Sequence, residues 1–204
     1  MSGFTDPSQH FFWLASRALG IVAMLLVTAA VACGLALSGR LAQRPGASAW
    51  LKTAHEALTL TSLGAIAGHG LLLLGDPYLH PGITGITLPF ALPTQSIWTG
   101  LGIIGAWLAA ILGLSYYARR WIGIATWRWL HRWTLLAYVL CLGHSIGSGT
   151  DARSVWMLVL LGAVTLPVIV IGGIRLRGVL GGRAASPAAA VRPSAPASQL
   201  RAEI

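Results

Sequence analysis

Five long apolar runs dominate the sequence and limit what the chain can fold into. A helix of about 20 apolar residues crosses the hydrocarbon core of a bilayer, and each run is long enough to form one. Only 9% of the residues are charged, against about 25% in a typical soluble domain. We therefore expect an all-α polytopic membrane helix bundle with five transmembrane helices. The expected spans cover residues 11–38, 50–74, 97–117, 126–146 and 155–174.

The basic residues are sorted to one side of these spans. Twelve of the fourteen Lys and Arg side chains fall in the linkers after the first and third spans, at the start of the fourth, or after the fifth. Only Arg17 and Arg153 fall on the opposite side. Because cytoplasmic loops carry an excess of Lys and Arg, we expect the N-terminus outside and the C-terminus in the cytoplasm. Topology then explains the net charge of +9, and we expect no nucleic-acid partner.

The chain divides into a membrane domain, residues 1–174, and a basic cytoplasmic tail, residues 175–204. The tail contains the low-complexity segment "AASPAAAVRPSAPASQ", whose composition is typical of disorder. A strong excess of Arg over Lys, with abundant Ala and Gly, suggests a GC-rich bacterial genome. We expect a multi-pass protein of the bacterial plasma membrane, surrounded by membrane lipid.

Two of the expected spans each carry two histidines. His55 and His69 in the second span are 14 residues apart, and His131 and His144 in the fourth are 13 apart. These separations correspond to about 21 and 20 Å along a helix axis. Both spans enter from the cytoplasmic side, so the histidines match in depth. We expect a 55/131 pair (His55 and His131) near the inner surface and a 69/144 pair (His69 and His144) near the outer one.

Two facing imidazoles are what a b-type haem takes as axial ligands. Two pairs at two depths therefore predict two haems b, with all four histidines as iron ligands. Small residues such as those of "GAIAG", 64–68, and Gly143 are expected to line the pockets. One alternative is structural histidines that hydrogen-bond between helices. Another is a metal-transport site, which normally adds carboxylates or thiolates, whereas Glu56 is the only acid within the spans.

The two histidine spacings place the side chains differently around a helix. At about 100° per residue, a 14-residue step returns to within about 40° of the same face, whereas a 13-residue step lands about 140° away. Either the fourth span is distorted, for example by a π-bulge, or the two haems approach it from different sides.

At these histidines the sequence resembles the ferric reductase-like transmembrane family. This family includes the membrane portion of NADPH oxidases and ferric reductases, and the haem subunit of bacterial methionine-sulfoxide reductase. Its signature is two histidine pairs on two helices with the spacings found here. The segment "LHRWTLLAYVLCLGHSIGSGTD" also resembles small stand-alone bacterial members, and the likeness covers about residues 11–174. The resemblance implies that the 55/131 pair holds an inner haem and the 69/144 pair an outer one.

The sequence departs from the family's oxidases at both ends. Those proteins usually have a sixth span ahead of these five and a cytosolic flavin and nicotinamide domain behind them. Here thirty residues follow Ile174, without a G-x-G-x-x-G after a strand. We therefore expect an oxidoreductase component that receives electrons from a partner flavoprotein, from quinol, or from a bound flavin that the sequence does not locate.

The expected function is transmembrane electron transfer through two bis-histidine b haems, from a cytoplasmic or quinol donor to an external acceptor. With both axial positions filled, neither iron has an open site, so we expect outer-sphere transfer and no catalytic residue. Two alternatives stay open. The chain is a haem membrane-anchor subunit that feeds a periplasmic reductase, such as a methionine-sulfoxide reductase, or it is a non-redox membrane transporter or scaffold.

Several other polar residues have two interpretations each. Arg17, in the first turns of span one, either pairs with propionates of the outer haem or extends to the interface. Lys52, Arg128 and Arg132 either do the same for the inner haem or only set topology. His80 lies in the Pro- and Gly-rich outer loop, which we expect to be irregular, and is either a contact for an acceptor such as chelated Fe(III) or a plain loop residue.

Overall fold

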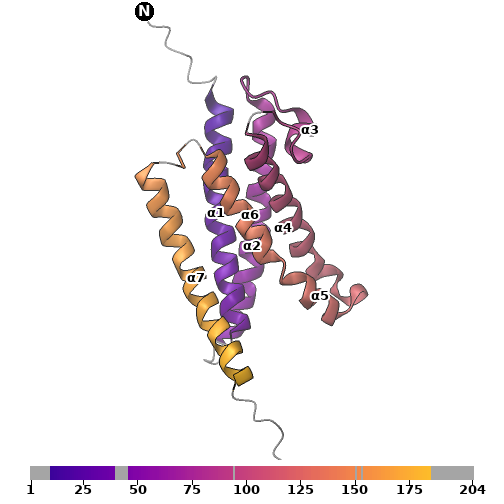
Figure 1. Ribbon diagram of the computed structural model, residues 1–204. Helices are drawn as coiled ribbons and strands as arrows, with labels where there is room; N and C mark the ends of the chain where they lie inside the picture. Colours follow the sequence, from indigo (N-terminus) through magenta and orange to yellow (C-terminus); the bar gives the residue numbers. More distant parts are fainter. Residues whose placement is uncertain (1–9, 40–45, 94, 150, 153, 185–204) are drawn as a thin grey trace, which may run out of the picture.

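The computed structural model describes residues 10–39, 46–93, 95–149, 151–152 and 154–184, and within them it is helical with no strand (Figure 1). This confirms the all-α prediction. The helices, in chain order, are α1 (Phe11–Ser38), α2 (Ala47–Leu72) with the short 3-10 helix η2 (Leu73–Gly75), α3 (Gly82–Thr87), α4 (Ser96–Ile122), α5 (Ile124–His131), α6 (Thr134–Ser148) and α7 (Val155–Ala184).

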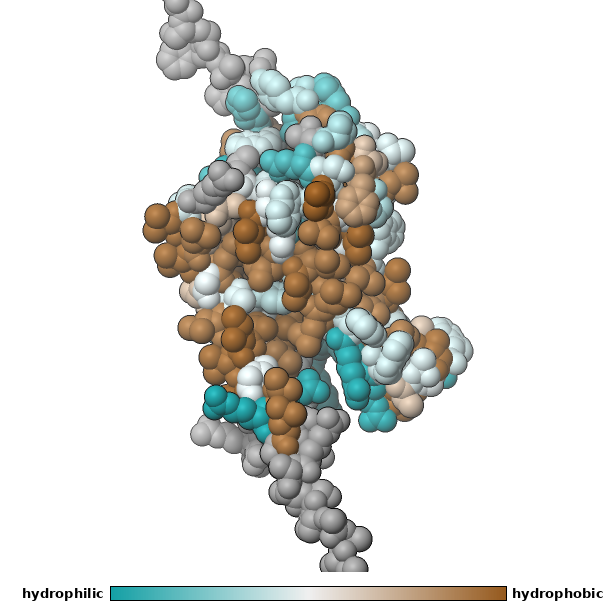
Figure 2. Space-filling view, viewed as in Figure 1, coloured by the Kyte–Doolittle hydropathy of each residue, from teal (hydrophilic) through white to brown (hydrophobic). Residues whose placement is uncertain are grey.

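Four helices in the described part of the chain are long and apolar enough to cross a membrane. They are α1, α2 with η2, α4, and α7 as far as Gly178. The molecular surface is consistent with membrane-crossing helices, because a broad hydrophobic zone lies between two ends that carry hydrophilic residues (Figure 2). Exposed apolar area of this extent is typical of contact with lipid. Helix α7 continues to Ala184, so it includes the first residues of the expected tail; residues 185–204 lie outside the described residues.

The expected fourth span is not one continuous helix. It consists of α5 and the 15-residue α6, with Arg132 and Trp133 between them. A helix of 15 residues is shorter than the about 20 residues that cross a bilayer. The structure thus supports four candidate spans directly.

The helices pack as two close pairs, with α1 against α2 and α4 against α6. Helix α7 lies against α1 (Figure 1). By contrast, α2 and α6 barely touch in the described part of the chain. The buried apolar core lies where α1, α6 and α7 meet. Its buried members are Met24, Leu35, Tyr138, Met157, Leu161 and Val168.

The outer loop, residues 75–96, is more ordered than expected, because it contains α3. The indole Nε1 of Trp107 donates a hydrogen bond of 2.9 Å to the Thr87 carbonyl, which fastens α3 to α4. The buried Asp76 carboxylate accepts the Tyr78 amide at 2.8 Å and so fixes the turn that precedes α3. Side-chain capping of this kind replaces the backbone partners that a loop lacks.

Candidate functional site

The structure brings the four predicted histidines together as two cross-helix pairs. The rings of His55 on α2 and His131 at the end of α5 have centroids 6.0 Å apart and planes at 87°. The rings of His69 on α2 and His144 on α6 have centroids 6.1 Å apart and planes at 69°. All four side chains are half-buried. In each pair, a ring on α2 therefore lies beside a ring on the α5–α6 segment, although the backbones of α2 and α6 make little contact.

A tightened turn between α5 and α6 explains how unequal spacings give two matched pairs. The amides of Arg132, Trp133, Leu135 and Leu136 bond to carbonyls three residues earlier, the 3-10 pattern. At 3.0 residues per turn, each such residue adds about 20° of rotation relative to an α-helix. About four of them reduce the offset of a 13-residue step from about 140° to about 60°, near the 40° of a 14-residue step. The segment expected to form the fourth span is therefore distorted, by tightening rather than by a π-bulge.

Three of the four imidazoles hydrogen-bond through Nδ1 to a backbone carbonyl of a neighbouring helix. His69 bonds to Ser16 at 2.8 Å and His55 to Ala30 at 2.8 Å, both on α1. His144 bonds to Trp98 on α4 at 3.0 Å. A carbonyl only accepts, so Nδ1 of each ring carries the proton and Nε2 of the neutral ring carries a lone pair. These contacts fix both the tautomer and the orientation of the ring.

A glycine makes room for each of these three rings. A Cβ added at Gly20 would lie 3.0 Å from Nδ1 of His69, and one added at Gly34 would lie 3.2 Å from Cε1 of His55. A Cβ added at Gly102 would lie 2.6 Å from Cγ of His144. Each glycine stands four residues, about one turn, after the residue whose carbonyl accepts the hydrogen bond. The combination of carbonyl and glycine holds the imidazole close to the neighbouring helix.

The glycines that we predicted to line the pockets, Gly64 and Gly143 among them, do not contact the histidine rings. A Cβ at Gly64 meets nothing within 4 Å, and one at Gly143 meets only Leu101 at 3.9 Å. Sequence reasoning missed the glycines of α1 and α4 that touch the rings. Their signal was nevertheless present, because Gly20 and Gly34 are 14 residues apart, as are His55 and His69.

His131 is held differently from the other three histidines. Its Nδ1 is buried and has no hydrogen-bond partner. The Leu112 carbonyl approaches it without hydrogen-bond geometry and instead accepts the Ser115 hydroxyl at 2.6 Å. The ring stacks on Trp127, with centroids 5.2 Å apart and planes at 29°. The indole Nε1 of Trp127 is also buried without a partner.

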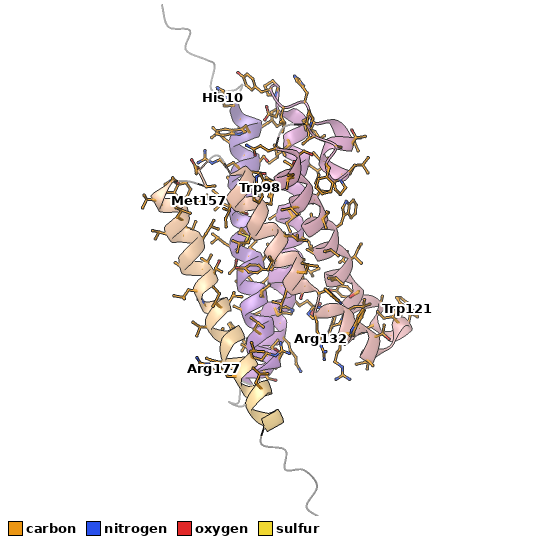
Figure 3. The ribbon with its side chains drawn as sticks, in the orientation of Figure 1. His10, Trp98, Trp121, Arg132, Met157 and Arg177 are labelled. Carbon is orange, nitrogen blue, oxygen red and sulfur yellow. The ribbon has the colours of Figure 1, made fainter. Side chains whose placement is uncertain are left out.

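A cavity of about 150 Å³ lies beside the 55/131 pair. Its wall includes both histidines of the pair, the core residue Tyr138 and the basic side chains of Arg132 and Arg175. Arg132 lies at the same end of the molecule as Arg177 (Figure 3). The 55/131 pair is thus the one next to the basic end.

The remaining predicted residues lie as follows. Arg17 forms an ion pair with Asp151 in the segment between α6 and α7, and its guanidinium lies 5.2 Å from the Trp13 ring centroid. Lys52 and Arg128 are exposed. His80 lies in the turn before α3 with a left-handed backbone, φ 40°.

Within the described residues, no group of three or more His, Cys, Asp or Glu side chains converges to hold a metal ion. Comparisons with protein-family models, with curated proteins and with solved structures found no match. Fold and site together define an all-α protein with membrane-spanning helices and two interhelical histidine pairs.

Proposed function

We propose that this protein binds two b-type haems through its two histidine pairs and carries electrons across a membrane. One observation carries the proposal. His69 and His144 both donate through Nδ1 to carbonyls, which leaves a lone pair on Nε2 of each ring, and the two ring centroids lie 6.1 Å apart. Two lone pairs repel unless they share an electrophile, and a metal between them is the electrophile that proteins use.

The ring separations support a metal better than a direct hydrogen bond. Two bonds of about 2.0 Å from a first-row metal to nitrogen, plus about 1.1 Å from each nitrogen to its ring centroid, give about 6.2 Å. A direct hydrogen bond of about 3.0 Å between ring nitrogens gives only about 5.2 Å. The observed values are 6.0 and 6.1 Å. A direct hydrogen bond between the two rings of a pair is therefore less consistent with the geometry, although three of the rings do hydrogen-bond to carbonyls of other helices, as structural histidines would.

The donor set supports haem over a bare metal ion. A transition-metal ion held by side chains alone typically takes three or four protein ligands. Each pair offers two imidazoles, and the described residues add no third His, Cys, Asp or Glu ligand. A porphyrin supplies the other four nitrogens. When bound, haem supplies one-electron redox chemistry at each depth.

The chain's own residues orient, space and shield the two sites. The α1 and α4 carbonyls fix three imidazoles, and the poor contact between α2 and α6 leaves a gap that the rings span. His55 and His69 are 14 residues apart on α2, about 21 Å along a hydrocarbon core of about 30 Å. Arg132 and Arg175, which line the cavity beside the 55/131 pair, are placed to neutralise carboxylates of a ligand there.

The proposal includes five crossings, with α5 and α6 together as the fourth, the N-terminus outside and the C-terminus in the cytoplasm. Under this topology a reductant on the cytoplasmic side meets the 55/131 pair first. The nearby basic residues attract an acidic donor protein, an effect that weakens as salt rises. The 69/144 pair of histidines then lies toward an external acceptor, at the other end from the 55/131 pair. The basic residues that we expect beside this pair include Lys52, Arg119, Arg120, Arg128 and Arg132.

Sealed right-side-out vesicles test the proposal. Vesicles loaded with ascorbate reduce external ferricyanide, to which the membrane is impermeable, only if electrons cross the bilayer. We expect His69→Ala and His144→Ala to abolish this reduction and His10→Ala, a histidine outside both pairs, to preserve it. Reduction that survives without His69 and His144 contradicts the transmembrane route.

A further inference from the structure

We propose that the two histidine pairs are unequal, so that the 55/131 site releases its haem faster than the 69/144 site. The inference rests on the proposed function and deepens it. In the 69/144 pair, both imidazoles donate to carbonyls and lie against a glycine. In the 55/131 pair, only His55 is held in this way.

Helix α4 lacks the second carbonyl and glycine pair that would hold His131. On α1, a carbonyl that accepts from a histidine and a glycine that contacts the same ring occur twice. They are Ser16 with Gly20 and, 14 residues later, Ala30 with Gly34. On α4 they occur once, as Trp98 with Gly102. Fourteen residues further along α4, the corresponding positions are Leu112 and Tyr116.

A tyrosine stands at the glycine position, and the Leu112 carbonyl approaches Nδ1 of His131 without hydrogen-bond geometry. The Tyr116 ring packs on Trp127, with centroids 5.8 Å apart, and Trp127 stacks on His131. The Leu112 carbonyl accepts the Ser115 hydroxyl at 2.6 Å. Nδ1 of His131 is buried and has no hydrogen-bond partner.

The backbone of His131 is also less firmly held than that of His144. His131 is the last residue of α5, an eight-residue helix that packs against α4. Helix α5 lies at the edge of the bundle (Figure 1). His144, by contrast, lies within α6, which packs along α4 and α1.

The size of the effect follows from the role of such hydrogen bonds. A partner on the second ring nitrogen orients a metal-bound imidazole and raises its basicity, and its loss typically costs about 10–100-fold in metal affinity. Because His131 lacks this partner, we expect haem to leave the 55/131 site about 10–100-fold faster than the 69/144 site.

Haem transfer from the purified full-length protein to excess apomyoglobin measures the two release rates. We expect two phases of equal amplitude. His55→Ala removes the fast phase and His69→Ala the slow one. Gly102→Ala places a Cβ 2.6 Å from the His144 ring and accelerates the slow phase. Gly64→Ala, whose Cβ meets nothing within 4 Å, is the matched control and leaves both rates unchanged.

The outcomes separate this inference from the proposed function. A protein that binds two haems but loses them at one rate, or loses the 69/144 haem first, overturns the inequality and leaves haem binding intact. A protein that binds no haem overturns the proposed function itself. Equal effects of Gly102→Ala and Gly64→Ala overturn the assignment of the slow phase to the carbonyl and glycine contact.

Discussion

The imidazoles of His69 and His144 face each other at 6.1 Å although 75 residues separate them in the chain. Each ring is turned by a carbonyl of a third helix, Ser16 of α1 for one and Trp98 of α4 for the other. Residues of four helices thus hold the two rings beside each other. Such an arrangement costs orientation and desolvation, a cost that the proposed metal between the rings would offset.

The near-perpendicular rings predict a spectroscopic signature. If haem is held between these rings at their angles of 87° and 69°, we expect a strongly anisotropic low-spin ferric signal, because near-perpendicular imidazole ligands would leave the iron d orbitals close in energy. Electron paramagnetic resonance of the oxidised protein should show such signals for both sites. Rhombic spectra typical of parallel imidazole planes at both sites contradict the observed ring geometry.

Pairing across helices predicts which substitutions have the same spectral effect. His55→Ala and His131→Ala should remove the same haem, because each leaves one axial ligand of the same iron. His69→Ala and His144→Ala should remove the other. Difference spectra of the four variants check this, with His80→Ala as the control. A common spectral loss from the two substitutions on α2 would show that the ligands pair along that helix instead.

The ion pair of Arg17 with Asp151 ties the start of α1 to the segment between α6 and α7. Both side chains are partly exposed, at 32% and 23%, so we expect a coupling energy of about 1 kcal/mol or less. A double-mutant cycle of Arg17→Gln and Asp151→Asn, read by thermal unfolding in detergent, measures it. Arg17→Gln should also leave the haem content unchanged. Loss of one haem would instead support the expected pairing of Arg17 with propionates.

The proposed topology predicts opposite labelling of the two ends of the bundle. His10 and Arg177 lie at opposite ends of the molecule (Figure 3). In a background in which Cys33 and Cys141 are replaced by Ala, Arg177→Cys should react with an impermeant maleimide only in inverted vesicles. His10→Cys should react only in right-side-out vesicles. Labelling of both from the same side contradicts an odd number of crossings.

Much of the fold follows from local sequence patterns. The apolar run 11–38 predicts α1 with the observed bounds, because its hydrophobicity is uninterrupted and no other element is needed to define it. The matched depths of the histidines likewise predict which rings meet. No glycine or proline marks the break at Arg132 and Trp133, although the half before it, which contains Arg128 and His131, is less apolar than the half after it. The 13-residue spacing signalled a distortion but did not specify its sense.

The carbonyl and glycine contacts that orient the histidine rings could not be predicted from local sequence patterns. A backbone carbonyl has no sequence signature, and a glycine on α1 contacts a histidine on α2 only once the two helices are packed. The sequence allowed Arg17 either to pair with a haem carboxylate or to extend to the interface, and its partner Asp151 lies far along the chain. Packing between helices, rather than any single helix, decides such contacts.

Haem stoichiometry tests the central claim most directly. The protein is produced with an ample supply of haem, purified intact, and measured by pyridine haemochrome absorbance against protein mass. Two histidine pairs predict a ratio near two haems b per chain, falling to near one in His69→Ala or His55→Ala and unchanged in His80→Ala. A ratio near zero in the unaltered protein would contradict haem binding at both pairs.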